Sequence, residues 1–228
     1  MALSAGDRAI AASSPLMRGL EPADQAAFMA RAHAGSAAAG HVLFEKGDRD
    51  ESLYIVLAGR VEISVTSANG RRIALNIIAT GDCFGEIGLL GGGARTASAV
   101  TLEACRFMIV NRRGFLAAVE ERPKLAIAMM QVLCERLRWV STILEDQTFL
   151  PLVQRLARRL LFLHGRFADE QGGLHISQAD IADFSGATRE AVNKILTGWR
   201  QLGWINLSRS TIAVRNQAAL SELAELGD

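Results

Sequence analysis

Short apolar runs in the middle of the chain constrain its fold more than any other feature. Between Val42 and Val110 lie the runs VLF, SLYIVL, RVEISV, RIALNII, TASAV and CRFMIV. Turn residues separate these runs, and Asn69-Gly70 is typical of a hairpin turn. Many short strands at nearly regular spacing favour an antiparallel barrel or jelly roll.

The segments that precede these runs are expected to be irregular or helical. Residues 1–20 are small and polar, which predicts a loose N-terminal lead-in. From Glu21 to Ala32 the chain has an acidic start, an early proline and helical spacing of its apolar residues, so a short helix is predicted. An alanine- and glycine-rich stretch from 34 to 40 then interrupts the chain. We assign residues 21–122 to a β-barrel domain with flanking helices.

A long helix is predicted from about Lys124 to Phe149. Its two mostly apolar stripes indicate that both sides of the helix are covered. One side can pack on the barrel and the other on a second copy, so residues 123–150 are interpreted as a dimerisation helix. Proline disfavours helix at the preceding residue, which makes Leu150 and Pro151 a candidate hinge. The first stripe is Leu125, Met129, Val132, Arg136, Val140, Ile143 and Gln147, and the second is Ile127, Met130, Cys134, Leu137, Ser141, Leu144 and Thr148.

Residues 151–228 carry the pattern of a helix-turn-helix. Ser177 is a suitable N-cap for a helix that reaches about Phe184, and a tight turn follows. Thr188 is a suitable N-cap for a second helix that reaches about Leu202. Polar side chains that can read base edges in a major groove gather at the start of this second helix. They are Thr188, Arg189, Glu190, Asn193 and Lys194.

Two further strand patterns follow, Trp204–Leu207 and Thr211–Val214. A β-hairpin after a helix-turn-helix is a wing, and the tip of a wing commonly touches phosphate. The candidate phosphate contacts are Arg209, Ser210 and Thr211. Asn216 is expected to cap a short final helix. The whole chain is therefore predicted to be an α+β protein, with an N-terminal antiparallel jelly-roll barrel, a long dimerisation helix and a C-terminal winged helix-turn-helix.

The stretch GEIGLLGGGARTAS, residues 85–98, interrupts the predicted barrel between two strands. Glu86 directly follows Gly85, and Arg95 comes nine positions later with Thr96 beside it. Glycines allow backbone N–H groups to approach a ligand closely. A carboxylate suits ribose hydroxyls, while a guanidinium and backbone amides suit a phosphate. The stretch therefore predicts a site for a sugar phosphate.

This stretch resembles the phosphate-binding cassette of cyclic-nucleotide-binding domains. Together with ISQADIADFSGATREAVNKIL, it makes the chain from about Leu16 to Val214 similar to the CRP/FNR family of bacterial transcription regulators. The resemblance implies a homodimer that binds a palindromic DNA site of two half-sites, with RNA polymerase as a further candidate partner. It also implies cAMP or cGMP as the effector and no prosthetic group. The nucleotide-binding residues that it implies are Gly85, Glu86, Ile87, Arg95, Thr96, Ser141 and Thr142.

Other classes of function fit the sequence less well. No metal-ligand cluster and no Ser/His/Asp arrangement supports an enzyme. No apolar stretch is long enough for a membrane span, and three cysteines without a C-x-x-C pair favour a reducing cytoplasm. A net charge of +1 means that DNA binding has to come from local placement of charge. Two alternatives stay open: a family member with another effector or none, and a cyclic-nucleotide-binding regulatory subunit of an enzyme.

Overall fold

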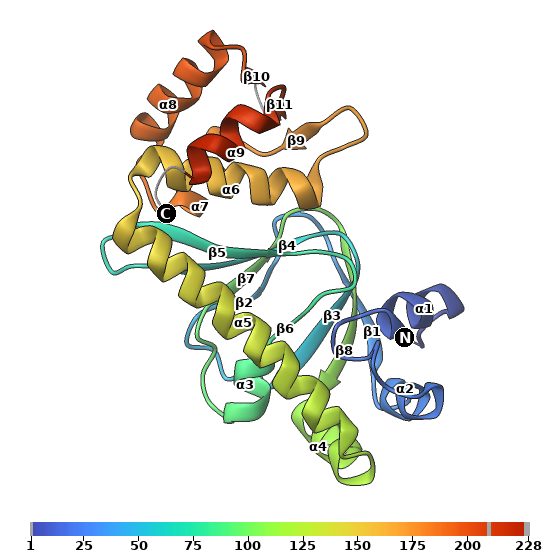
Figure 1. The fold of residues 1–228 in the computed structure, drawn as a ribbon. Helices are drawn as coiled ribbons and strands as arrows, with labels where there is room; N and C mark the ends of the chain where they lie inside the picture. Colours follow the sequence, from blue (N-terminus) through green and yellow to red (C-terminus); the bar gives the residue numbers. More distant parts are fainter. Residues whose placement is uncertain (1, 209–210, 226–228) are drawn as a thin grey trace. The chain divides into compact units, whose positions relative to one another are not determined.

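The computed structural model describes residues 2–208 and 211–225 (Figure 1). The chain divides into two compact units. The first comprises the chain up to residue 65 together with 75–138, and the second comprises 66–74 together with the chain from 139 onward. The domain limits expected from the sequence, at 122/123 and 150/151, stay a prediction.

Eight strands form two four-stranded antiparallel sheets, as the apolar runs predicted. The first sheet has the order β1-β8-β3-β6 and the second has the order β2-β7-β4-β5, so strands distant in sequence lie side by side. The first sheet contains β1 (His33–Ala37), β8 (Cys105–Asn111), β3 (Ser52–Ala58) and β6 (Cys83–Phe84). The second contains β2 (Val42–Phe44), β7 (Ser98–Thr101), β4 (Val61–Thr66) and β5 (Arg72–Ile78).

Aromatic side chains fill the space within the barrel. Phe84 stacks on Tyr54 with ring centroids 5.0 Å apart, and Phe107 meets both of these rings edge-on. Phe44 completes the cluster, 5.9 Å from Tyr54. The stacked pair consists of Tyr54 from β3 and Phe84 from β6. The end of β6, which leads into residues 85–98, is therefore fixed in the core.

The N-terminal segment is ordered, so the expectation of a loose lead-in was wrong. Residues Ala5–Ala12 form helix α1. The side chain of Ser4 accepts a hydrogen bond from the backbone N–H of Asp7, and the carboxylate of Asp7 accepts one from the backbone of Ser4. This reciprocal capping box fixes the start of the helix. Beyond it, Leu16 and Met17 are fully buried in the barrel core, which holds the segment in place.

Helices α2 and α4 and strand β1 also belong to the first unit. Helix α2 (Pro22–Met29) confirms the predicted short helix, although it is shorter at both ends. Helix α4 (Arg112–Glu121) begins where the side chain of Asn111 accepts a hydrogen bond from Gly114 N. Strand β1 occupies part of the stretch that was expected only to interrupt the chain.

Helix α5 (Lys124–Phe149) has the predicted extent. The early part of its first stripe, Leu125, Met129 and Val132, is buried against the barrel core. The second stripe is exposed along its length, with 68% of Leu137 and 66% of Leu144 accessible. Val140 departs from the pattern, because it belongs to the first stripe and is nevertheless 54% exposed.

The second unit has the predicted winged-helix elements. The unit contains α6 (Leu152–Phe167), β9 (Gly173–His175), α7 (Gln178–Ser185), α8 (Arg189–Gln201), β10 (Ile205–Leu207), β11 (Thr211–Val214) and α9 (Gln217–Glu225). The hairpin β10-β11 is extended by β9, which the sequence did not reveal. Asn216 caps α9 as predicted, since its side chain accepts a hydrogen bond from Ala219 N.

Candidate functional site

The first candidate site lies where strand β6 turns into the short helix α3 (Glu86–Gly91). Gly85 makes this turn with a φ of 92°. A Cβ at Gly85 would lie 2.6 Å from the carbonyl oxygen of Ser52 and 2.7 Å from Nη1 of Arg95. Only glycine combines this backbone conformation with this close approach. Glu86 follows Gly85 in the chain, and Arg95 donates a hydrogen bond to the carbonyl oxygen of Gly85. We call this group of residues the phosphate cradle (Asp50, Ser52, Gly85, Glu86 and Arg95), after the sugar-phosphate site that the sequence predicts.

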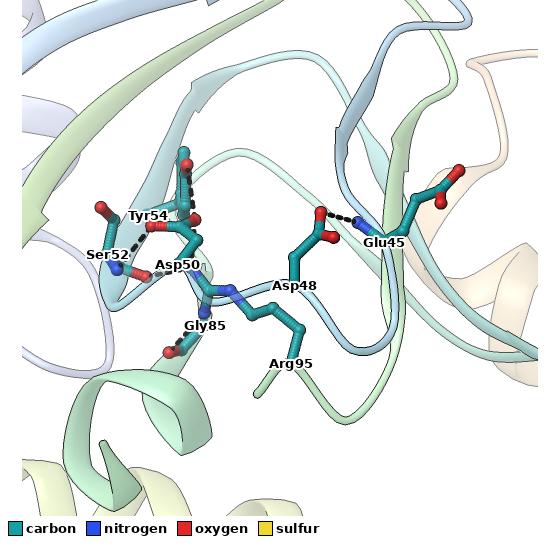
Figure 2. A network of polar contacts seen from close by, with 7 residues as sticks. All are labelled: Glu45, Asp48, Asp50, Ser52, Tyr54, Gly85 and Arg95. Atoms are coloured by element: carbon teal, nitrogen blue, oxygen red, sulfur yellow. Dashed lines mark hydrogen bonds and ion pairs between the residues drawn. The ribbon is translucent and has the colours of Figure 1, made fainter. Parts of the chain in front are cut away.

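Arg95 is 3% exposed, and its guanidinium is almost fully engaged (Figure 2). Nη1 donates to the carbonyl oxygen of Gly85 at 2.8 Å, and Nη2 donates to the carbonyl oxygen of Ser52 at 2.7 Å and to Oδ2 of Asp50. The guanidinium lies over the ring of Phe44, 3.9 Å from its centroid. Among the described residues, Nε of Arg95 is buried without a hydrogen-bond partner.

Asp50 is the anionic partner of Arg95 in the cradle. Its Oδ1 accepts a hydrogen bond from Ser52 N at 3.0 Å, and its Oδ2 accepts one from the Tyr54 hydroxyl at 3.1 Å. Burial pushes the pKa of Asp50 upward, but the hydrogen bonds from Arg95 and Ser52 outweigh it and lower the pKa. Burial, and then the charge of Asp50, raise the pKa of Tyr54 to about 12. The carboxylate is therefore ionised and the phenol is protonated at neutral pH.

Glu86 is 5% exposed and lies beside a cation of helix α5. Nε of Arg136 is 3.6 Å from Oε1 of Glu86, and Nη2 of Arg136 donates to the carbonyl oxygen of Cys83 at 2.8 Å. Both charged residues of the cassette thus have internal partners of opposite charge. A ligand that binds Glu86 and Arg95 has to rearrange or share these contacts.

The structure brings together Gly85, Glu86 and Arg95, as the sequence predicted. Ile87 and Thr96 are exposed next to them. The other two predicted nucleotide contacts, Ser141 and Thr142, are exposed residues of α5 that fall in the second unit, and their role stays a prediction.

Sequence reasoning missed Asp50 and Arg136. Asp50 lies 45 positions before Arg95, and Arg136 lies 53 positions after Cys83. No local pattern relates residues so far apart, so only the folded barrel reveals these contacts.

Cys83 lies two residues before Gly85, close enough to the cradle for a redox role to be considered. The thiol is buried, and this burial raises its pKa to about 12. Since the thiolate is the reactive form, Cys83 behaves as a core residue. Cys105 is also a buried free cysteine.

The second candidate site is the exposed face of helix α8. Thr188 caps this helix, as its hydroxyl accepts a hydrogen bond from Ala191 N at 3.3 Å. Helix α7 begins in a capping box between Ser177 and Asp180, and Gly186 ends it with a φ of 64°. Buried apolar residues join the two helices, namely Ile181 and Phe184 from α7 and Val192, Leu196 and Trp199 from α8.

This packing leaves the polar side of α8 turned to solvent. The predicted base-contacting residues Arg189, Glu190, Asn193 and Lys194 are all exposed. The same face continues for two more turns through Thr197 and Gln201, which line one surface with Glu190 and Lys194. The helix thus presents donors and acceptors to solvent along about three turns, and side chains of these types can pair with base edges.

The predicted phosphate contacts in the wing are only partly described. Arg209 and Ser210 lie outside the described residues. Thr211 begins β11, where its hydroxyl is 3.3 Å from Nδ1 of His175 on the neighbouring strand β9. Nε2 of His175 is in turn 3.1 Å from the carboxylate of Asp169. The role of these wing residues stays a prediction.

Comparison with known proteins identifies both halves of the chain. Residues 35–122 match the family of cyclic nucleotide-binding domains, and residues 154–223 match the Crp-like helix-turn-helix domain. The chain is 31% identical over 220 residues to the "CRP-like cAMP-activated global transcriptional regulator" of Mycobacterium tuberculosis, which covers 94% of this chain and 98% of that protein. It is 31% identical over 212 residues to the "Cyclic AMP receptor protein" of Thermus thermophilus, which covers 92% of this chain and 97% of that protein.

A solved structure agrees with these similarities. A CRP/FNR family transcriptional regulator from Thermus thermophilus has a TM-score of 0.75 and 25% identity, and the match covers 86% of this chain and 100% of that one. The fold and both sites define a regulator with a cyclic nucleotide-binding domain and a DNA-binding domain. The chain belongs to the CRP/FNR family of transcription regulators.

Within residues 2–208 and 211–225, no group of three or more His, Cys, Asp or Glu side chains is arranged to hold a metal ion. None of the helices in the described ranges is long and apolar enough to cross a membrane.

Proposed function

We propose that this protein is a sequence-specific DNA-binding regulator whose DNA affinity is controlled by a cyclic mononucleotide, with cAMP as the first candidate and cGMP as the second. The observation that carries the proposal is the phosphate cradle. Glu86 and Arg95 are each at most 5% exposed, and the guanidinium of Arg95 is bonded to the carbonyl oxygen of Gly85, a residue whose surroundings leave no room for a side chain. The names of the two relatives that are 31% identical support cAMP.

Each cradle residue has a chemical role in this proposal. The carboxylate of Glu86 accepts a hydrogen bond from the ribose 2′-hydroxyl. The guanidinium of Arg95 pairs with the cyclic phosphate, a charge-assisted contact that is stronger than one between neutral groups. The exposed hydroxyl of Thr96 adds a donor beside the phosphate or the base, while Ser141 and Thr142 contact the base.

The contact between Glu86 and Arg136 offers a route from the ligand to helix α5. A ribose that engages Glu86 changes the partner available to Arg136, which is also bonded to the carbonyl oxygen of Cys83. The ligand can shift the state of α5 only by as much as its affinities for the two states differ. Such a shift reaches the DNA-binding domain through the proposed hinge at Leu150 and Pro151.

The exposed stripe of α5 is proposed to pair with the same stripe of a second copy. Met130, Leu137 and Leu144 follow one another at seven-residue spacing and are all more than half exposed. That spacing is the one that packs two helices side by side. A dimer would place two α8 helices so that they enter major grooves one turn apart, about 34 Å on DNA.

Calorimetric titration with cAMP and cGMP tests the ligand half of the proposal. Arg95→Ala is expected to lose about 1.5–3 kcal/mol of binding free energy, the range for a hydrogen bond to a charged group. Arg113→Ala is the matched control, because Arg113 is an exposed arginine on α4. If neither cAMP nor cGMP binds at millimolar concentration, cyclic-nucleotide control is contradicted.

An electrophoretic mobility shift assay tests whether the protein binds DNA and whether nucleotide changes that binding. We expect nucleotide to increase affinity for a specific site far more than for random DNA. A protein that binds nucleotide but no DNA would instead support the alternative of a regulatory subunit. A protein that binds specific DNA equally well with and without nucleotide would support a regulator with another effector or none.

A further inference from the structure

The cradle contains an anion that competes with any ligand phosphate, the side chain of Asp50. We propose that Asp50 determines ligand specificity at this site: it must be displaced from Arg95 by the incoming phosphate, and it favours a singly charged phosphodiester over a doubly charged phosphomonoester. This inference rests on the proposed function of the cradle as a cyclic-nucleotide site.

Asp50 is the one acceptor on Arg95 that can give way. The other two acceptors are the backbone carbonyl oxygens of Gly85 and Ser52, which the turn and strand β3 hold in place. The Asp50 side chain is 30% exposed, whereas that of Arg95 is 2% exposed. A phosphate that approaches the guanidinium therefore exchanges with the carboxylate, and the two carbonyl contacts keep Arg95 in position.

Asp50 stays at the cradle even after Arg95 has turned to a ligand. Ser52 N and the Tyr54 hydroxyl both donate to its carboxylate, independently of Arg95 (Figure 2). Its negative charge thus continues to act on whatever occupies the site. Asp50 faces the buried guanidinium of Arg95 and is itself only 30% exposed, so water and salt screen its charge less than that of a fully exposed carboxylate.

The charges of the site balance before a ligand arrives. Asp50 pairs with Arg95, and Glu86 faces Arg136. A cyclic phosphate adds one negative charge, whereas a phosphomonoester adds about 1.5 to 2 at neutral pH. Because each added charge is repelled by Asp50, the carboxylate disfavours a 5′-phosphate more than a cyclic phosphate with the same base and sugar. The site can thereby reject mononucleotides that share every other feature of its ligand.

The test compares cAMP and 5′-AMP by calorimetric titration of the full-length protein and its Asp50→Asn variant. The substitution keeps the shape of the side chain and removes its charge. We expect Asp50→Asn to tighten cAMP about tenfold and 5′-AMP about 30- to 100-fold, since about a factor of ten per ligand charge follows from Coulomb repulsion across a partly screened distance. The preference for cAMP over 5′-AMP would then fall about three- to tenfold.

Two matched variants separate the charge of Asp50 from nonspecific effects. Asp48→Asn removes a nearby carboxylate whose Oδ2 accepts a hydrogen bond from Glu45 N at 2.8 Å, and it should change neither affinity. Tyr54→Phe removes the hydroxyl that holds Asp50 but keeps the charge and the aromatic ring. If the charge selects the ligand, Tyr54→Phe keeps the preference for cAMP, whereas mere loosening of the cradle would reduce it as Asp50→Asn does.

The outcomes distinguish this inference from the proposed function. If the wild-type protein binds cAMP and Asp50→Asn binds it no tighter, or leaves the preference over 5′-AMP unchanged, the role of Asp50 is overturned and the cyclic-nucleotide site stands. If neither the wild-type protein nor any variant binds a cyclic nucleotide, the proposed function itself fails and the role of Asp50 falls with it.

Discussion

The turn at Gly85 offers the sharpest test of how the cradle is built. Replacing Gly85 by alanine imposes two separate costs. The first is a side chain at a φ of 92°, and the second is a Cβ within 2.7 Å of both the Ser52 carbonyl oxygen and Arg95 Nη1. The chain provides a control for the first cost alone. Gly81 has the same φ of 92°, and a Cβ there would meet nothing within 4 Å.

The two costs can be estimated separately. A non-glycine residue in the left-handed region loses about 1–2 kcal/mol, which is the expected destabilisation for Gly81→Ala. Forcing an extra methyl into a packed site costs a further 1–3 kcal/mol or so. Gly85→Ala should therefore lower the free energy of unfolding by about 2–5 kcal/mol. It should also weaken cAMP binding about tenfold or more, because the methyl group displaces the guanidinium of Arg95.

Urea unfolding followed by circular dichroism, together with calorimetric titration, measures both effects. We expect Gly85→Ala to be less stable than Gly81→Ala by the steric cost, and to bind cAMP more weakly. Equal destabilisation by the two substitutions would refute the argument that close approach at the cradle requires glycine. Wild-type cAMP affinity in Gly85→Ala would refute the claim that this turn positions Arg95.

Three more predictions concern the other parts of the chain. Arg189→Ala should lose about 1–3 kcal/mol on a specific site and little on random DNA, as measured by fluorescence anisotropy; equal losses on both would exclude Arg189 from base reading. Glutamate at both Leu137 and Leu144 should yield folded monomers in sedimentation velocity, because both side chains are exposed in the monomer and their replacement disrupts only the proposed pairing of the helices. An unchanged mass would place the dimer interface elsewhere. The pKa of Asp50 is lowered in the folded protein, so its stabilising contribution is present above the ordinary carboxyl pKa of about 4 and is lost as the pH falls through the folded-state pKa. In urea unfolding, Asp50→Asn should therefore lose less stability than the wild type between pH 6 and pH 3, and equal losses in the two proteins would contradict this assignment.

The helices predicted correctly from sequence are those with strong local signals. Helix α5 has its predicted limits, and Ser177 and Thr188 cap the helices that they were expected to cap. These features depend on residues a few positions apart, so one sequence is enough to find them. Helix α1 was missed although its capping box, Ser4 and Asp7, was readable. Its small residues gave no apolar face, and its order depends on the burial of the residues that follow.

Strand β1 and the partners of the cassette could not be read in the same way. The HAGSA sequence of β1 has low strand propensity, and pairing with β8 decides its conformation. Asp50 is one of several charged residues in a polar turn, and Arg136 is one member of a mostly apolar helical stripe, so neither has a local signal of function. They become functional candidates only because the barrel and α5 bring them to Arg95 and Glu86.

The sequence by itself determined the order of the parts: a strand-rich barrel with a glycine-rich cassette, a long helix with two apolar stripes, and a winged helix-turn-helix. It could do so because periodicity, caps and turns are set by near neighbours. Only the tertiary structure decided the electrostatic state of the cradle. Ion pairs between residues about 45 positions apart depend on how the sheets fold over one another, and this long-range pairing gives Arg95 an internal anionic partner.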